Sequence, residues 1–258
     1  MSSARSVIIT GAGSGIGAGI AKVFAEAGDR VFLADISEER AATVADALPG
    51  AVSAHRVDVT DLSAVQGLAE QVVAETGRID VLVSNAGVFD AIAGIRETTP
   101  ALWQRVIDIN LTGTYNVVKS VAETMISQQY GRIVCIGSIA GQRSLPDGLA
   151  YCASKAGLEG FVRRLAYDLG RFNITANVVA PGLIKSNIRQ NSAEILGDIV
   201  PDTNVGFSSN VELRDLLIPA RRGGDPADIA SAVFYLASES AGYVSGEVLH
   251  VDGGWIGA

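Results

Sequence analysis

The chain has 258 residues, of which 48% are hydrophobic, so it is long enough to bury one large core. Its net charge of -8 and its pI near 4.8 argue against nucleic acid or an anionic membrane surface as partners. No apolar run reaches the roughly 18 residues that a membrane-spanning helix needs. A strand pattern begins at Ser6, which leaves no room for a signal peptide, so we expect a cytoplasmic protein.

Two cysteines are too few for a disulfide framework, and the two histidines are far apart in separate strand patterns. We therefore expect no metal site.

Short apolar segments alternate with helical patterns along the whole chain. The predicted strands are residues 7–10, 30–34, 52–57, 81–84, 133–137, 175–180 and 248–251. They are rich in Val and Ile and mostly do not alternate, which is typical of parallel strands covered on both faces. Helix start signals lie between strands, at Asp61, at Thr99-Pro100 and at Asp225-Pro226. This order predicts an α/β fold in one domain, residues 1–258, with a doubly wound parallel seven-stranded sheet in three α/β/α layers, a Rossmann fold.

A glycine-rich turn follows the first predicted strand. It reads Thr10-Gly11-Ala12-Gly13-Ser14-Gly15-Ile16-Gly17, and a helical pattern continues to about Ala27. Glycines permit a tight turn and a close backbone approach, and a helix N-terminus offers free N–H groups to a pyrophosphate. Its position between the first strand and the first helix predicts a dinucleotide site.

The second predicted strand ends at Asp35, with Ile36 next. A carboxylate at this place can accept hydrogen bonds from the hydroxyls of an adenosine ribose, and it would repel a 2′-phosphate. No Arg or Lys lies in the glycine turn or directly after Asp35 to neutralise such a phosphate. We therefore predict NAD rather than NADP as the cofactor. The alternative is that Asp35 faces solvent or caps a helix, since it stands just before Ser37.

The least regular part of the chain is residues 186–219, which contain two prolines and two glycines but many apolar side chains. Long connections in compact domains usually act as lids or binding loops. We predict that this segment is a substrate-binding loop that closes over the site.

These motifs together resemble the short-chain dehydrogenase/reductase family in its single-domain form, and the resemblance covers essentially the whole chain. TGAGSGIG at residues 10–17 is similar to the family's TGxxxGxG turn, and YCASK at residues 151–155 to its YxxxK motif. SNAG at residues 84–87 is similar to its NNAG, with Ser84 in place of the first Asn. Pro181-Gly182 is similar to its PG turn beside the nicotinamide, and Ser186 stands where the family usually has Thr.

The resemblance implies a site with four catalytic residues, Asn110, Ser138, Tyr151 and Lys155. The cofactor residues that it implies are Gly11, Ser14, Gly15, Ile16, Gly17, Asp35, Ile36, Asp58, Val59, Asn85, Ala86, Gly87, Tyr151, Lys155, Pro181, Gly182, Ile184 and Ser186. Ser138, Ile139, Gln142, Leu145 and Leu183 would bind the substrate. By the same resemblance the protein would be a homotetramer, with the helices from Thr99 and from Tyr151 in one interface.

Tyr151 and Lys155 are one helical turn apart. An ammonium about 4 Å from a phenolate contributes on the order of 4 kcal/mol at an effective dielectric of 20. We therefore expect Lys155 to lower the pKa of Tyr151 toward the range where a general base works best. Tyr151 would take the hydroxyl proton of an alcohol, or return it in reduction, and Ser138 would stabilise the substrate oxygen. Asn110 would position a water that links Lys155 to solvent.

The expected wall of the substrate site is mostly apolar, which favours a neutral lipophilic or cyclic secondary alcohol or ketone. One alternative is a 3-oxoacyl-[acyl-carrier-protein] reductase, for which Arg163, Arg164 and Arg171 could form a basic docking patch. Another is a non-catalytic dinucleotide-sensing regulator, which would be expected to lack the Ser, Tyr and Lys that this chain keeps. The enoyl-reducing branch of the family spaces its Tyr and Lys more widely.

Overall fold

Seven parallel strands form one sheet, in the order β3-β2-β1-β4-β5-β6-β7. The computed structural model describes residues 4–143, 147–202 and 216–257. The strands are β1 (Ser6–Thr10), β2 (Arg30–Asp35), β3 (Val52–Arg56), β4 (Val81–Ser84), β5 (Gly131–Ile136), β6 (Ile174–Pro181) and β7 (Val248–Val251). The predicted doubly wound α/β fold is confirmed, and strand ends differ from the prediction by at most two residues, as in β5. The chain order reverses between β1 and β4, which creates the switch point where such sheets bind ligands.

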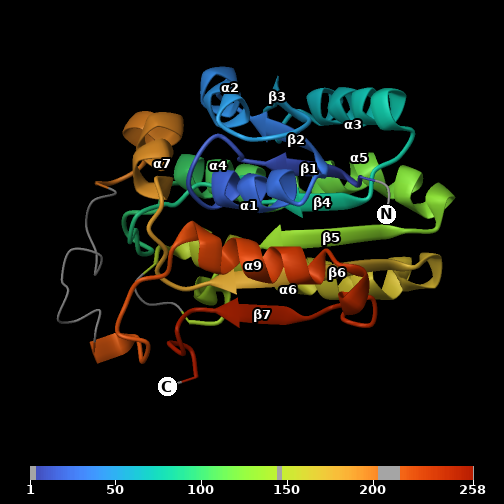
Figure 1. Cartoon of the computed structure of the whole chain (residues 1–258). Helices are drawn as coiled ribbons and strands as arrows, with labels where there is room; N and C mark the ends of the chain where they lie inside the picture. Colours follow the sequence, from blue (N-terminus) through green and yellow to red (C-terminus); the bar gives the residue numbers. More distant parts are fainter. Residues whose placement is uncertain (1–3, 144–146, 203–215, 258) are drawn as a thin grey trace.

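Helices cover both faces of the sheet. They are α1 (Gly15–Glu26), α2 (Glu38–Asp46), α3 (Leu62–Thr76), α4 (Pro100–Ile107), α5 (Gly113–Gln128), α6 (Leu149–Leu169), α7 (Ile188–Leu196) and α9 (Pro226–Leu236). One core packs α1, α2 and α9 on the first face through residues such as Phe24 and Val233. A second core packs α3, α4, α5 and α6 on the other face. In Figure 1, α7 lies outside these layers, beyond the carboxyl ends of the strands.

The predicted helix starts carry the caps that their sequences indicate. Asp61 accepts the backbone N–H groups of Ser63 and Ala64 at 2.9 and 3.2 Å. Thr99 accepts that of Leu102 at 3.2 Å, with proline at the first helical position. Each cap satisfies N–H groups that the helix itself leaves unpaired, so these short polar residues fix where the helices begin.

A π-helical turn, Asp108–Thr112, joins α4 to α5 into one continuous rod. Its backbone hydrogen bonds join residues five apart in the chain, whereas those of an α-helix join residues four apart. Such turns occur mostly as single bulges within α-helices, frequently at functional sites. The hydroxyl of Thr114 donates to the carbonyl of Asn110 at 2.9 Å and so satisfies a backbone group there. The sequence pattern did not predict this interruption.

The predicted loop at 186–219 contains the regular helix α7. The rest of that prediction falls partly on residues 203–215, which lie outside the described part of the chain.

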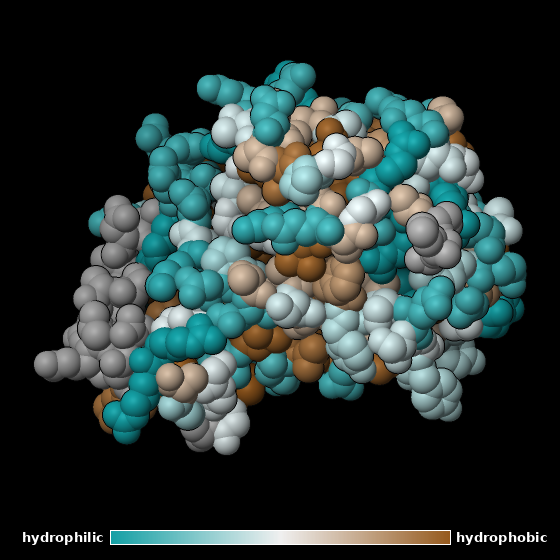
Figure 2. Space-filling view, viewed as in Figure 1, coloured by the Kyte–Doolittle hydropathy of each residue, from teal (hydrophilic) through white to brown (hydrophobic). Residues whose placement is uncertain are grey.

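On the face shown in Figure 2, hydrophilic residues predominate and hydrophobic ones gather toward the middle, over α1 and α9. Within the described residues, no helix is both long and apolar enough to cross a bilayer.

Candidate active site

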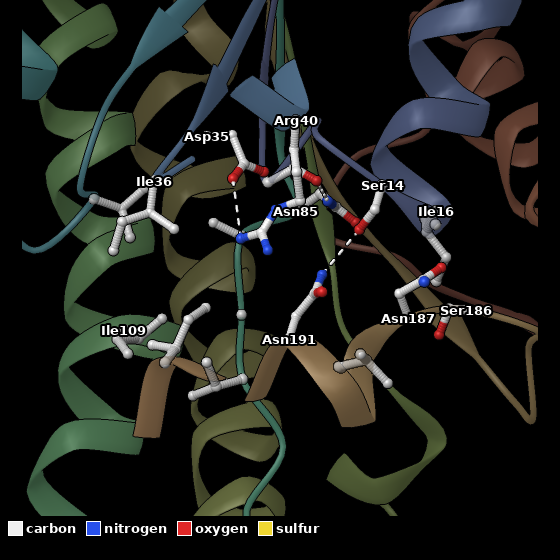
Figure 3. Close-up of a pocket in the computed structure, with 18 of the residues that line it drawn as sticks. Ser14, Ile16, Asp35, Ile36, Arg40, Asn85, Ile109, Ser186, Asn187 and Asn191 are labelled. Atoms are coloured by element: carbon white, nitrogen blue, oxygen red, sulfur yellow. Dashed lines mark hydrogen bonds and ion pairs between the residues drawn. The ribbon is translucent and has the colours of Figure 1, made fainter. Parts of the chain in front are cut away.

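The first cavity opens at the carboxyl ends of β1 and β4 and has a volume of about 130 Å³. Its wall includes the expected cofactor residues Gly11, Ser14, Gly15, Ile16, Asp35, Ile36, Asp58, Val59, Asn85, Ala86, Gly87 and Ser186. Figure 3 shows the side chains of Ser14, Ile16, Asp35, Ile36, Asn85 and Ser186 around the opening, with Asn187 and Asn191 on the α7 side. The cavity therefore joins the glycine turn to the ends of β2 and β4.

The glycine turn is folded tightly enough to exclude side chains. A Cβ on Gly17 would lie 2.2 Å from the carbonyl oxygen of Gly11, and Gly11 and Gly15 have φ of +62° and +54°. The amide of Asn85 donates to the carbonyls of Thr10 and Gly11, each at 2.9 Å, and ties β4 to the turn. A backbone cradle at the start of α1 is the environment that a pyrophosphate requires, so these residues fit a dinucleotide. Gly17 itself lies beneath the cavity and does not line it.

Asp35 lies at the far end of this cavity and is 9% exposed. Its two oxygens accept the backbone N–H groups of Gly13 and Ser37, each at 2.9 Å. The carboxylate is thus fixed between the glycine turn and α2. Asp35 does not cap α2, because Ser37 is the N-cap and accepts the N–H of Arg40; the carboxylate instead holds Ser37 and lines the cavity.

Arg40 also lines this cavity, and the sequence analysis missed it. Its guanidinium Nη2 is 3.9 Å from Asp35 Oδ1, and its Nη1 is 2.8 Å from Glu194 Oε2 on α7. Arg40 is five residues beyond Asp35, outside the glycine turn and the positions next to the carboxylate. The sequence signal that could have predicted it is a cation in the first turn of the helix after β2, because a side chain there can turn back toward the strand end.

The second cavity, of about 400 Å³, adjoins the first and shares Ile16, Asn85, Gly87, Ser186 and Ile188 with it. Among the expected residues it is lined by Ser138, Ile139, Tyr151, Lys155, Pro181, Gly182, Leu183 and Ile184. The hydroxyl, phenol and ammonium groups that could act on a substrate therefore share a cavity with the cofactor side.

Tyr151 is only 8% exposed, and its ring meets the ring of Phe89 edge to face, with centroids 5.4 Å apart. Burial raises the pKa of its phenol, the charge of Asp147 raises it further, and a hydrogen bond with Ser138 opposes the rise. The expectation that Lys155 brings this pKa down is therefore wrong for the residues of this chain alone. Burial is the largest influence on this pKa, because it disfavours the charged phenolate.

Lys155 Nζ lies 5.5 Å from the centre of the Tyr151 ring and donates to the carbonyl of Ile136 at 2.9 Å. Burial lowers its pKa to about 8. The ammonium is held at the carboxyl end of β5, within the cavity but directed to the backbone.

Asn110 is fully buried and lies behind the cavity. Its Oδ1 accepts the N–H of Val88 at 2.8 Å, and its Nδ2 donates to the carbonyl of Val88 at 3.0 Å and to Ser154 Oγ at 3.0 Å. The side chain therefore fastens the segment after β4 to α6. This arrangement assigns the amide a positioning role.

Charged side chains enter the substrate wall that the sequence analysis expected to be mostly apolar. Asp147, Lys185 and Arg189 line the second cavity beside Phe89 and Trp255. The guanidinium of Arg189 lies 5.1 Å from the Phe89 ring centre. Burial and the nearby charge of Asp90 raise the pKa of Asp147 to about 6. The cavity thus holds ionic groups next to Tyr151.

Two expected substrate residues are not brought into the site. Gln142 lies outside the cavity wall and donates to Glu159 Oε1 at 3.2 Å, because this polar side chain finds a carboxylate partner on α6. Leu145 lies outside the described residues. Among the residues that the structure does describe, no group of three or more His, Cys, Asp or Glu is placed to hold a metal ion.

The comparisons with known proteins agree on one family of reductases. A family model described as enoyl-(acyl carrier protein) reductase matches residues 11–256. The 3-oxoacyl-[acyl-carrier-protein] reductase FabG of Thermotoga maritima is 36% identical over 252 residues, covering 96% of each chain. The corresponding reductase MabA of Mycobacterium tuberculosis is 37% identical over 250 residues, covering 97% of this chain and 92% of MabA.

Solved structures agree with these relatives. Levodione reductase superposes with a TM-score of 0.86 at 30% identity, with 98% of each chain covered. An oxidoreductase from Burkholderia thailandensis, described as a short-chain dehydrogenase/reductase, gives a TM-score of 0.85 at 35% identity over 100% of this chain and 94% of its own. With the glycine turn, the Tyr151–Lys155 pair and the order of the sheet, these similarities establish that the chain belongs to the short-chain dehydrogenase/reductase family.

Proposed function

We propose that this oxidoreductase interconverts a ketone and a secondary alcohol with a nicotinamide dinucleotide. The observation that carries the proposal is the continuity of the two cavities, with Ser138, Tyr151 and Lys155 in the wall of the larger one. When bound, the nicotinamide accepts or supplies the hydride. The residues of the chain then have to bind the substrate oxygen, move one proton and exclude water.

Tyr151 is the proton donor in reduction and the proton acceptor in oxidation, acting at its phenol oxygen. Its raised pKa keeps it protonated, which suits the donor role at neutral pH. Ser138 shares a hydrogen bond with this phenol and would stabilise the charge on the substrate oxygen. Lys155, with a pKa of about 8, supplies a positive charge close to the same ring.

The replacement Tyr151→Phe tests this mechanism. It keeps the ring that packs on Phe89 and removes the hydroxyl, so turnover should fall by about 10²- to 10⁴-fold while dinucleotide binding stays near normal. Near-normal turnover in this variant would contradict the assignment. If the wild type bound the dinucleotide tightly but reduced no carbonyl compound, a dinucleotide sensor would be favoured instead.

For the cofactor, we propose NAD(H), supported by the carboxylate of Asp35 in the wall of the smaller cavity. The assay compares NADH with NADPH at equal concentration on one substrate. Equal or better kcat/KM with NADPH would exclude this preference.

For the substrate, the relatives' names support a 3-oxoacyl thioester better than a neutral cyclic ketone. The basic docking patch is less well supported by the contacts on α6, because Arg163 and Arg164 form ion pairs with Glu159 and Asp168 of the same helix. The chain therefore fits the 3-oxoacyl chemistry more firmly than it fits carrier docking.

Three substrates separate these possibilities: a 3-oxoacyl group on an acyl carrier protein, the same acyl group on N-acetylcysteamine, and a cyclic diketone. A strong preference for the carrier-bound form would support the carrier-protein reductase. Comparable rates with the first two would favour a reductase of free thioesters, and a preference for the diketone would support the lipophilic ketone.

The homotetramer also remains a proposal. Exposed aromatic side chains support an interface through α4, α5 and α6, where Trp103, Tyr115 and Tyr167 are 39%, 50% and 80% exposed. Sedimentation equilibrium at two protein concentrations would give the mass of the assembly. The cytoplasmic location expected from the sequence stays a prediction.

A further inference from the structure

We propose that Glu194 on α7 is a second determinant of cofactor preference, because its carboxylate pairs with the Arg40 guanidinium that could otherwise bind a 2′-phosphate. This inference rests on the proposed dinucleotide function. It concerns a residue outside the glycine turn and outside the strand end that carries Asp35, on the helix that lies across the carboxyl edge of the sheet.

Arg40 is the cation best placed to meet a phosphate near Asp35. Its guanidinium is 3.9 Å from the Asp35 carboxylate in the wall of the same cavity, and Figure 3 shows the two side chains facing each other. A guanidinium binds phosphate oxygens in a planar, forked geometry, so it could neutralise the group that Asp35 repels. A phosphate that approached Asp35 would therefore come within reach of Arg40.

Glu194 competes for this guanidinium. Arg40 Nη1 is 2.8 Å from Glu194 Oε2, and the other Glu194 oxygen accepts the amide of Gln190 at 3.1 Å, which orients the carboxylate. The Nε atom of Arg40 is buried without a hydrogen-bond partner. With Asp35 on one side and Glu194 on the other, the guanidinium is already matched by two negative charges.

A second contact holds α7 in this place. Asn191 Nδ2 donates to Ser14 Oγ at 2.9 Å, so α7 is joined both to the glycine turn and to α2. Figure 3 shows Asn191 directed to Ser14 across the cavity. Glu194 is therefore positioned by its helix, and its effect on Arg40 is a property of the folded chain.

The test uses two fragments that differ only at the 2′ position, 5′-AMP and adenosine 2′,5′-bisphosphate, titrated calorimetrically into the full-length protein. The variant Glu194→Gln should bind the bisphosphate about 2- to 5-fold more tightly than wild type, as expected for loss of one partly exposed ion pair. Its affinity for 5′-AMP should not change. The double variant Arg40→Gln/Glu194→Gln should bind the bisphosphate no more tightly than wild type, because the freed guanidinium is absent.

The matched control is Asp198→Asn, which removes an equal charge from an exposed residue just beyond α7. An equal gain in this control, or no gain in Glu194→Gln, would overturn the inference. So would a weaker affinity for the bisphosphate in the single variant Arg40→Gln, because it would show that Arg40 already binds this phosphate while Glu194 is present. Failure of the wild type to bind 5′-AMP would reject the dinucleotide function itself, and the inference with it.

Discussion

The carboxylate of Asp90 accepts the backbone N–H of Tyr151 at 2.9 Å, although the two residues lie on different segments of the chain. Asp90 is fully buried in the segment after β4, and Tyr151 lies in the first turn of α6. The bond acts as a helix cap supplied from a distance, because it satisfies an N–H group that the helix leaves free. The segment that carries the cavity-lining Gly87 therefore also fixes the helix that carries Tyr151.

Replacing Asp90 should separate its bond from its charge. In Asp90→Leu the Tyr151 N–H loses its acceptor in a buried place, and we expect a loss of about 1–3 kcal/mol in the free energy of unfolding. Asp90→Asn keeps an acceptor of the same shape and should lose less. Denaturant unfolding measures both, and equal losses would show that the hydrogen bond is not what Asp90 contributes.

Asp147 should make both stability and rate depend on pH. Its pKa is raised to about 6, mainly by burial, so the protonated carboxyl stabilises the fold below pH 4 and this contribution is lost as pH rises through 6. Relative to wild type, Asp147→Asn should gain on the order of 1–2 kcal/mol of stability between pH 4 and pH 7. Unfolding curves at both pH values measure the change.

The same replacement removes a charge that raises the pKa of Tyr151. The rise of the oxidation rate with pH should therefore move to lower pH by about 0.5–1 unit. Asp46→Asn, an exposed carboxylate on α2, is the matched control and should leave both profiles in place. A shift of the same size in the control would contradict the assignment of this effect to the Asp147 charge beside Tyr151.

The glycine cradle gives a steric prediction. Gly17→Ala would place a methyl group 2.2 Å from the Gly11 carbonyl oxygen, so the turn has to move. We expect a loss of about 1–3 kcal/mol in stability and of at least about 10-fold in 5′-AMP affinity. Gly67→Ala on α3, where a Cβ meets nothing within 4 Å, should instead stabilise by about 0.5–1 kcal/mol. Similar behaviour of the two variants would refute the close approach.

Asn110 should stabilise the fold through its three side-chain hydrogen bonds. Asn110→Ala removes both bonds to Val88 as well as the bond to Ser154, and should destabilise the fold by about 1–3 kcal/mol. Ser154→Ala keeps the Val88 bonds and should cost less than about 1 kcal/mol. Thermal unfolding of the two variants tests the positioning role, which an Asn110→Ala protein of unchanged stability would disprove.

The fold was predictable because its signals are local and repeated. Unbroken Val and Ile segments indicated the buried strands, and Asp61 and Thr99 indicated helix starts through their own hydrogen bonds. The neighbours that decide electrostatics come from elsewhere in the chain. Asp147 acts on Tyr151 through space, and Glu194 contacts Arg40 from another helix. No regular spacing in the sequence predicts either pair.

The predicted direction of the Tyr151 pKa shift was wrong for a related reason. A one-turn spacing in the sequence placed the ammonium near the ring, as the structure also has it. Sequence spacing does not reveal how much water surrounds the pair, and desolvation proved to be the larger effect.

The π-helical turn between α4 and α5 determines which residues the rod turns inward. Its buried positions recur every four residues, from Leu102 through Val106, Asn110 and Thr114 to Val118. In an uninterrupted α-helix such a stripe would rotate by about 40° at each step and leave the core. The extra residue in the wide turn takes up part of this drift. Deleting one residue from this turn would restore ordinary helical geometry and leave α4 and α5 in nearly the same phase, so the wide turn absorbs its extra residue locally without rotating the helices on either side.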